Sequence, residues 1–167
     1  MNRLWAPWRK KYVTHKVKVK GCLFCNALRS KNDKSNFVVS RSRHSFSMLN
    51  LYPYNNGHVM VVPVRHVDDL DKLNGAELLD LTQHLVRVKK LLKQTLKPEG
   101  FNIGINLGRG AGAGITSHVH IHIVPRWVGD NNFMPVLSST KIISDSLESL
   151  YDQLIKASQK ASGRTRR

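Results

Sequence analysis

The chain has little cysteine and no long apolar run, and each shortage excludes a class of protein. Only 2 of its 167 residues are cysteines, too few for the disulfide framework of a small secreted domain. No apolar stretch approaches the ~20 residues that a membrane-spanning helix needs. The first residues lack the apolar core of a signal peptide. We therefore expect a soluble, cytoplasmic protein with no membrane partner.

Acidic residues are also scarce. The chain carries 27 Lys and Arg but only 11 Asp and Glu, which gives a formal net charge of +16. The excess is concentrated in residues 1–20 and 156–167, which contain no acidic residue. Such ends are typical of solvated tails, which we favour, although they also permit non-specific binding of nucleic acid. A small polyanionic substrate suits the remaining positive charge equally well.

The length suits one compact domain. We divide the chain into a basic N-terminal arm at 1–20, a folded domain at 21–160 and a disordered basic tail at 161–167. Apolar and alternating runs predict strands at 37–39, 45–51, 58–63, 101–106 and 117–125. The pattern of strands and helices predicts an α+β fold, in which a long helix packs on an antiparallel sheet.

Two segments have the apolar spacing of helices. Residues 75–97 carry one apolar stripe, formed by Leu78, Leu81, Leu85, Val88, Leu92 and Leu96. A second helix is expected from about Asp145 to Lys160, with Glu148 completing a capping box. Its predicted buried residues are Leu147, Leu150, Tyr151 and Leu154. A short knuckle or helix start is expected at 22–28.

The most informative stretch carries three alternating histidines, His118, His120 and His122. Strand periodicity places them on one face, with the intervening apolar residues in the core. The alternatives are a chance exposed face and a metal-binding strand. The three Cα atoms span roughly 13 Å, so a single ion can bind two imidazoles and leaves at least one for another role.

A glycine-rich segment at 106–114 leads into these histidines. Glycine lets backbone N–H groups approach phosphate oxygens closely, which predicts a phosphate site. A dinucleotide-binding fingerprint is excluded because a strand, not a helix, follows the loop. In such a site a neutral imidazole can attack the α-phosphorus of a nucleotide without a separate base, giving a nucleotidyl-histidine.

The segment 118–124 has the pattern His-x-His-x-His-x-x, and the chain resembles the histidine-triad (HIT) superfamily over roughly residues 22–136. Within it, the chain looks most similar to the diadenosine tetraphosphate phosphorylase and hydrolase branch. The segments that carry this likeness are 4–9, 22–25, 57–63 and 124–135. The resemblance implies the HIT-like fold, a homodimer, and cleavage of a dinucleoside polyphosphate at the α-phosphate with phosphate or water as acceptor. The alternatives are a nucleoside phosphoramidate hydrolase and a non-catalytic nucleotide- or nucleic-acid-binding module.

The resemblance also implies roles for individual residues. His120 matches the nucleophile, whose other ring nitrogen is held by the backbone carbonyl of His118. His122 matches the histidine that contacts phosphate oxygens. Asn106 matches the amide at the phosphates and Asn50 the ribose-binding position. His58 matches a histidine beneath the site, where it is either a direct ligand or a satisfied core histidine.

The chain departs from the family after the glycine loop. Many members have Gly-Gln-Ser/Thr there, whereas this chain has Gly112 followed by Ala113, Gly114, Ile115 and Thr116. Thr116 or the backbone amides of Gly114 and Ile115 are expected to replace the missing side-chain amide. The sequence leaves open whether Arg109, Arg126 and Trp127 contact the nucleotide or lie on the surface.

Cys22 and Cys25 form a Cys-x-x-Cys pair. Alone, this pair fits a redox motif, two unlinked thiols or a zinc knuckle. The preceding residues make a poor strand, which disfavours the redox motif. Many triad proteins complete a zinc site with the first triad histidine and one after the Val-Pro strand, which match His118 and His66. The resemblance therefore implies structural zinc and no organic cofactor.

Overall fold

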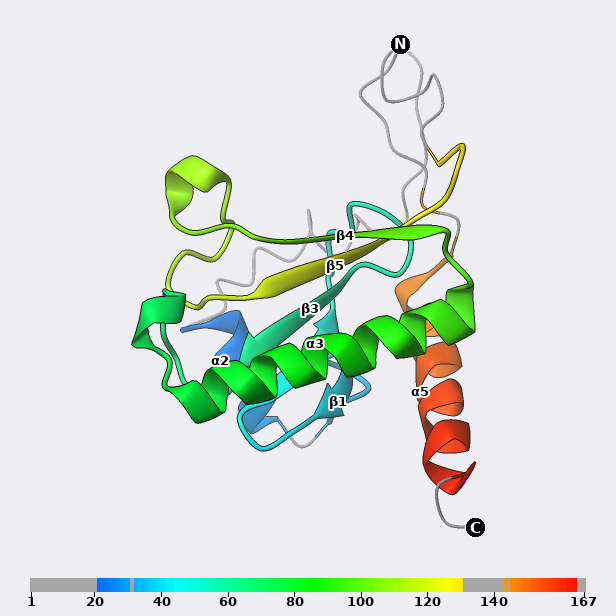
Figure 1. Ribbon diagram of the computed structural model, residues 1–167, viewed down its shortest axis with the longest axis horizontal. Coiled ribbons are helices and arrows are strands. Elements are labelled where there is room, and N and C mark those ends of the chain that lie inside the picture. Colours follow the sequence, from blue (N-terminus) through cyan, green and yellow to red (C-terminus); the bar gives the residue numbers. More distant parts are fainter. Residues whose placement is uncertain (1–20, 31, 131–142, 144, 165–167) are drawn as a thin grey trace.

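The computed structural model describes residues 21–30, 32–130, 143 and 145–164. Five antiparallel strands form one sheet in the order β1-β2-β3-β5-β4 (Figure 1). The strands are β1 (Val38–Arg41), β2 (Ser45–Leu49), β3 (Val59–Pro63), β4 (Gly100–Ile105) and β5 (Ile121–Arg126). Three predicted segments lie outside the described residues: the arm at 1–20, residues 131–135 of the stretch that resembles the HIT superfamily, and the last residues of the tail.

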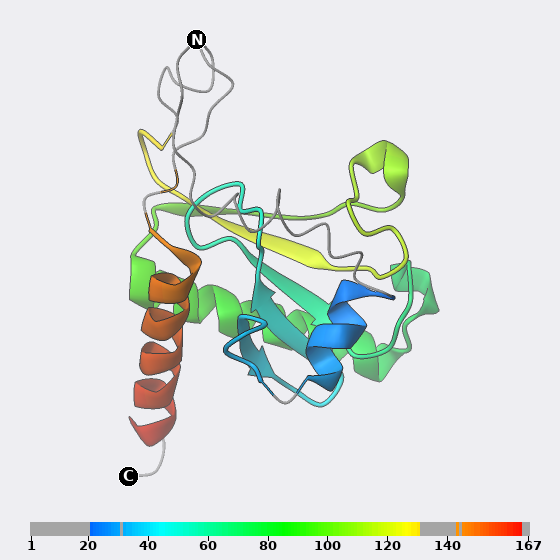
Figure 2. The ribbon, with the colours of Figure 1, turned by 180° about the vertical axis from the view of Figure 1, so that it is seen from behind.

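Helices cover both faces of the sheet, which confirms the α+β class. The long helix α3 (Gly75–Leu96) and α5 (Leu147–Arg164) lie on one face. The short helix α2 (Leu23–Arg29) lies on the other (Figure 2). Alternation along β3 separates two apolar clusters, because Val59 and Val61 face α3 whereas Met60 faces α2. No helix in the described part of the chain is long and apolar enough to cross a bilayer.

Helix α3 begins with a capping box and ends at a residue in the left-handed backbone conformation. The Asn74 side chain accepts a hydrogen bond from the Glu77 N–H, and the Glu77 carboxylate accepts one from the Asn74 N–H. Lys97 closes the helix in the left-handed region, with φ 49°. The prediction for Leu78 was wrong, since this side chain is 38% exposed. The buried face of the helix instead begins at Glu77. This carboxylate can be buried because Arg65 binds both of its oxygens.

The boundaries of β5 and α5 also differ from the prediction. Strand β5 starts at Ile121, not near residue 117, because the Val119 N–H bonds to the Val67 carbonyl and draws the chain off the sheet. Helix α5 is capped by the Ser146 hydroxyl, which accepts from the Ser149 N–H at 3.1 Å, in place of Asp145. It ends at Arg164, not near Lys160.

A polar network missed by the periodicity argument fixes α3 to the sheet. His84 is buried, and its Nε2 lies 2.7 Å from the Ser40 hydroxyl. Its Nδ1 lies 2.8 Å from the Ser45 hydroxyl, which donates to the Asp80 carboxylate. Because every polar atom named here has a partner, the network is compatible with burial and sets the register of α3 on β1 and β2.

We predict that the free energy of unfolding falls as the pH drops from about 6.5 to 4. Burial lowers the pKa of His84 from 6.5 to about 4, so the unfolded chain takes up this proton first. The contribution is fully present above pH 6.5 and is lost as the pH approaches 4. Urea titrations across this range measure it. A His84→Gln variant should show a shallower slope, and an identical slope would exclude His84 as the source.

Candidate active site and metal centre

The three triad histidines lie on the sheet face that carries α2. All three are buried. The ring of Phe24 from α2 lies 5.3 Å from that of His118 and 4.9 Å from that of His120. The rings of His120 and His122 are 4.7 Å apart. The imidazoles of His120 and His122 therefore lie side by side, and Phe24 packs against that of His120.

The backbone fixes which nitrogen of His120 carries the proton. Its Nδ1 lies 2.9 Å from the His118 carbonyl oxygen, which can only accept. Burial lowers the pKa of His120 below 6.5, so the ring is neutral at neutral pH. The proton therefore sits on Nδ1, and Nε2 keeps a free lone pair. A lone pair held in a fixed direction is what nucleophilic attack requires.

On His122 the proton lies on the other ring nitrogen, Nε2, because a chain of hydrogen bonds ends at its Nδ1. The Tyr54 N–H donates to Nδ1 of His58 at 3.0 Å. Burial lowers the pKa of His58 to about 3, so this ring is neutral and its Nε2–H donates to Nδ1 of His122 at 2.9 Å. Burial also lowers the pKa of His122 to about 4. Its single proton therefore lies on Nε2, which makes His122 a neutral hydrogen-bond donor.

The Nε2 of His122 is buried and has no hydrogen-bond partner among the described residues. A buried donor without a partner costs free energy, so it marks a place where a ligand acceptor fits. His58 is thus a satisfied buried histidine whose partner is His122. Asn50 lies beside it, with its amide nitrogen 3.3 Å from Nδ1 of His58.

An open hollow of about 190 Å³ adjoins His122 on the side of β4. Its lining includes Tyr54, Asn102, Gly104, Asn106, His122 and Val124. The sequence-predicted Asn106 therefore lines the same hollow as His122. Sequence reasoning missed Tyr54, whose ring lies 4.5 Å from that of His58 and 5.6 Å from that of His122.

The glycine loop projects from the body as the 3-10 turn η2 (Arg109–Ala111), at one end of β4 and β5 (Figures 1 and 2). Gly112 closes this turn with φ 84°, a conformation that favours glycine. Neither Gly112, Gly114 nor Thr116 belongs to the lining of the hollow. Ile115 packs against the apolar cluster of Phe24. In this structure the loop therefore does not contact the described hollow.

Arg126 has a structural role in the turn after β5. Its guanidinium binds both oxygens of Asp130 at 2.7 Å and the Asn102 side-chain oxygen at 2.8 Å. The Trp127 N–H also donates to Asp130. Arg109 is exposed in η2. The ion pair with Asp130 fixes the turn, and the hydrogen bond to Asn102 joins Arg126 to the wall of the hollow.

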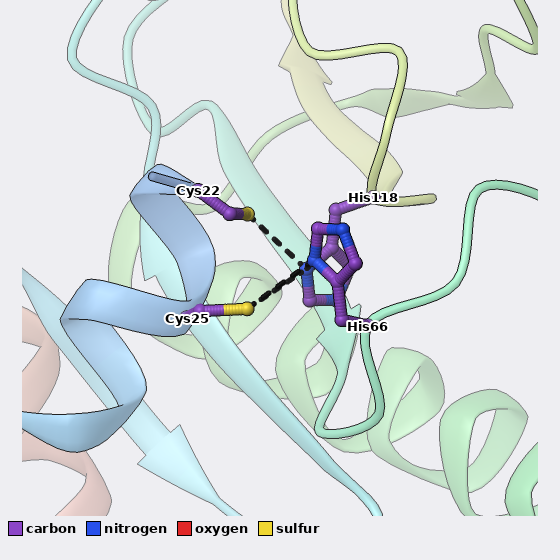
Figure 3. Close-up of side chains that lie close together, drawn as sticks. All are labelled: Cys22, Cys25, His66 and His118. Atoms are coloured by element: carbon purple, nitrogen blue, oxygen red, sulfur yellow. Dashed lines mark hydrogen bonds between the residues drawn. The ribbon is translucent and has the colours of Figure 1, made fainter. Parts of the chain in front are cut away.

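Cys22, Cys25, His66 and His118 form a cluster that could hold a metal ion (Figure 3). Their four donor atoms lie within 4.8 Å of one another. Sγ of Cys25 is 3.3 Å from Nδ1 of His66, and the two Nδ1 atoms are 3.2 Å apart. Tetrahedral zinc with Cys₂His₂ ligands places such atoms roughly 3.3 to 3.8 Å apart. The spacing therefore fits a zinc ion.

The surroundings of the cluster orient its ligands. Nε2 of His118 donates to the Pro63 carbonyl at 2.9 Å, which leaves the Nδ1 lone pair facing the two thiols. Cys22 is the N-cap of α2, and Cys25 lies in its first turn. At the other end of this helix, Arg41 donates to the Ala27 and Leu28 carbonyls. Helix α2 is thus held at both ends.

Taken together, these observations describe an antiparallel sheet that carries buried histidines, with the rings of His120 and His122 side by side. The HIT domain family model matches residues 31–128. The chain belongs to the HIT domain family.

Individual relatives agree with this assignment. The chain is 40% identical over 158 residues to "AP-4-A phosphorylase" of Mycobacterium tuberculosis, covering 88% of this chain and 79% of the relative. Among solved structures, a Zn-bound histidine triad family protein from Mycobacterium smegmatis is 25% identical. Its TM-score is 0.66, and the match covers 86% of this chain and 97% of that one. A histidine triad nucleotide-binding protein from Sulfolobus tokodaii is 26% identical with TM-score 0.67, covering 87% and 95%.

Proposed function

We propose that this protein is an enzyme that cleaves dinucleoside polyphosphates, such as diadenosine tetraphosphate, at the α-phosphate through a nucleotidyl-His120 intermediate. The observation that carries the proposal is the pairing of opposite tautomers. His120 offers a lone pair on Nε2, and the neighbouring His122 offers a proton on Nε2 without a partner among the described residues. One ring is suited to attack phosphorus, and the other to bind the phosphate oxygens.

The reaction proceeds in two balanced steps. Nε2 of His120 forms a bond to the α-phosphorus, and the bond from this phosphorus to the bridging oxygen breaks. The electron pair leaves with the polyphosphate chain, while the His122 Nε2–H stabilises charge on the phosphate oxygens. The oxygen of inorganic phosphate or water then bonds to the same phosphorus, the nitrogen–phosphorus bond breaks with its electron pair returning to Nε2 of His120, and the acceptor's proton passes to solvent.

We favour inorganic phosphate as the acceptor and place water second. The support is the 40% identity to the protein named as a phosphorylase, which extends over most of the chain. A tetraphosphatase of Schizosaccharomyces pombe, described as asymmetrical, is 37% identical over only 71 residues. An adenosine 5'-monophosphoramidase of Candida albicans, 28% identical over 92 residues, supports phosphoramidate hydrolysis as the second candidate.

Product analysis distinguishes these activities. The protein is incubated with diadenosine tetraphosphate with and without inorganic phosphate, and the nucleotides are separated by chromatography. ADP and ATP formed only with phosphate indicate a phosphorylase. AMP and ATP formed without phosphate indicate a hydrolase. If the dinucleotide stays intact in both mixtures, the proposal is wrong, and release of AMP from adenosine phosphoramidate would support the second candidate.

The remaining site assignments belong to the same proposal. Asn106 binds the phosphates beside His122, and Asn50 binds a ribose hydroxyl. Gly112, Gly114, Ile115 and Thr116 contribute backbone or hydroxyl donors, which requires the loop to close over the substrate. The Cys₂His₂ cluster holds a structural zinc ion, and the chain acts as a homodimer in the cytoplasm.

We predict that His58→Phe lowers kcat by roughly 100-fold, the usual cost of losing one oriented donor to a transition state. Without the His58 Nε2–H, nothing in the described chain fixes the proton of His122 on Nε2. A His58→Gln variant keeps an amide donor at this position and should recover part of the lost rate. Steady-state kinetics on both variants measures the effect. If glutamine restores no activity, His58 does not act by orienting His122.

A further inference from the structure

The ring of His120 packs against those of Phe24 and His122. His122 also lines the hollow beside β4, whereas Phe24 does not. Nucleophilic attack expels the leaving group on the side of the phosphorus opposite the nitrogen. A long leaving group therefore needs room beyond the catalytic pair.

Gly104 keeps the floor of the hollow clear. It lies directly opposite His122 in the β4–β5 ladder, on the same face of the sheet. A Cβ built at this glycine meets no atom within 4 Å, so a larger side chain would project into open space. The backbone there is ordinary strand. The absence of a side chain, not an unusual conformation, is what this position supplies.

The walls offer aromatic and amide groups. Tyr54 is 53% exposed, although its ring lies against the buried His58. An exposed aromatic ring held at the edge of a hollow can stack a nucleobase. Asn102 has its side-chain oxygen bound to Arg126, which leaves its NH₂ group available as a donor.

The hollow fits one part of a ligand. Pockets that enclose a whole small molecule hold about 300–1,000 Å³, whereas this open hollow holds about 190 Å³. We propose that it receives the leaving half of the substrate, with the distal phosphates beside Asn106 and Asn102 and the second base stacked on Tyr54. This proposal rests on the proposed function and adds the residues that select a dinucleotide over a mononucleotide with a small leaving group.

The test compares two substrates that transfer the same AMP. One is diadenosine tetraphosphate, and the other is adenosine 5'-phosphoramidate, which releases only ammonia. A Gly104→Val variant should lower the ratio of kcat/KM values, dinucleotide over phosphoramidate, by at least tenfold, and Tyr54→Ala should also lower it. Gly100→Val is the matched control, because this strand glycine also has open space but does not line the hollow. An unchanged ratio, or equal losses on both substrates, would overturn the proposal.

A binding measurement keeps the test independent of turnover. In a His120→Asn background, calorimetry gives the affinities for diadenosine tetraphosphate and for AMP. Adding Gly104→Val should weaken dinucleotide binding about tenfold more than AMP binding. If the wild-type protein cleaves neither substrate, the proposed function fails. This binding comparison still tests whether the hollow receives the second half of the dinucleotide. Equal effects on the two ligands would refute it.

Discussion

Replacing His120 with glycine is expected to reduce cleavage of diadenosine tetraphosphate by roughly 10⁴-fold or more, as removal of a nucleophile does in other enzymes. Nucleotide binding should persist, because the hollow, Asn106 and His122 do not depend on this ring. The buried carbonyl of His118 would lose its partner, and a water molecule in the space that the imidazole vacates is expected to replace the N–H. Turnover assays and calorimetry on the same preparation measure the two properties separately.

A matched control and a direct chemical observation sharpen this prediction. His44→Ala removes a histidine from the β1–β2 turn, away from the triad, and should leave turnover near the wild-type rate. Mass spectrometry of wild-type protein quenched at high pH should show a fraction that carries one added AMP group, and this fraction should be missing in His120→Gly. Comparable turnover by the glycine variant would refute the nucleophile assignment.

The sequence predicted the positions of the triad histidines better than it predicted the hydrogen bonds that set their protonation. Alternation placed His120 and His122 together, and the Cys-x-x-Cys spacing placed both thiols on one short helix. Neither pattern reveals which ring nitrogen carries a proton. That depends on the Tyr54 N–H and the His118 carbonyl, which are backbone groups with no signature in the side-chain pattern.

The apolar stripe read from the sequence does not include His84, which is buried in the structure. Serines from β1 and β2 satisfy both of its ring nitrogens. The cost of burying a polar group depends on partners that are distant in sequence. Ser40 and Ser45 meet His84 only after the sheet has formed and α3 has packed on it.

Arg126 makes contacts within the chain that the sequence does not predict. A basic residue just after the histidine strand suits a phosphate contact as well as it suits a surface position. Its fork-like pairing with both oxygens of Asp130 instead fixes the turn that follows β5. Because it also binds Asn102, its effect on the substrate should be indirect, through the wall of the hollow.

Removal of the metal is expected to have the second large effect. The purified protein should contain about one zinc ion per chain, and His66→Ala should abolish this content and lower the melting temperature by about 10 °C or more. Two of the four donors lie on α2, whereas His66 follows β3 and His118 precedes β5. An ion bound there would join three separate segments, so its loss removes a cross-link between them.

Elemental analysis by plasma mass spectrometry and thermal melts test this prediction, with His44→Ala as a histidine control outside the cluster. Unchanged zinc content in His66→Ala would remove His66 from the ligand set, and a metal-free wild type would refute the zinc proposal altogether. The same cluster affects the orientation of His120, because His118 offers its Nδ1 to the cluster and its backbone carbonyl to the His120 ring. Variants that lose zinc should therefore lose turnover even below their melting temperature, while His120→Gly should keep its zinc.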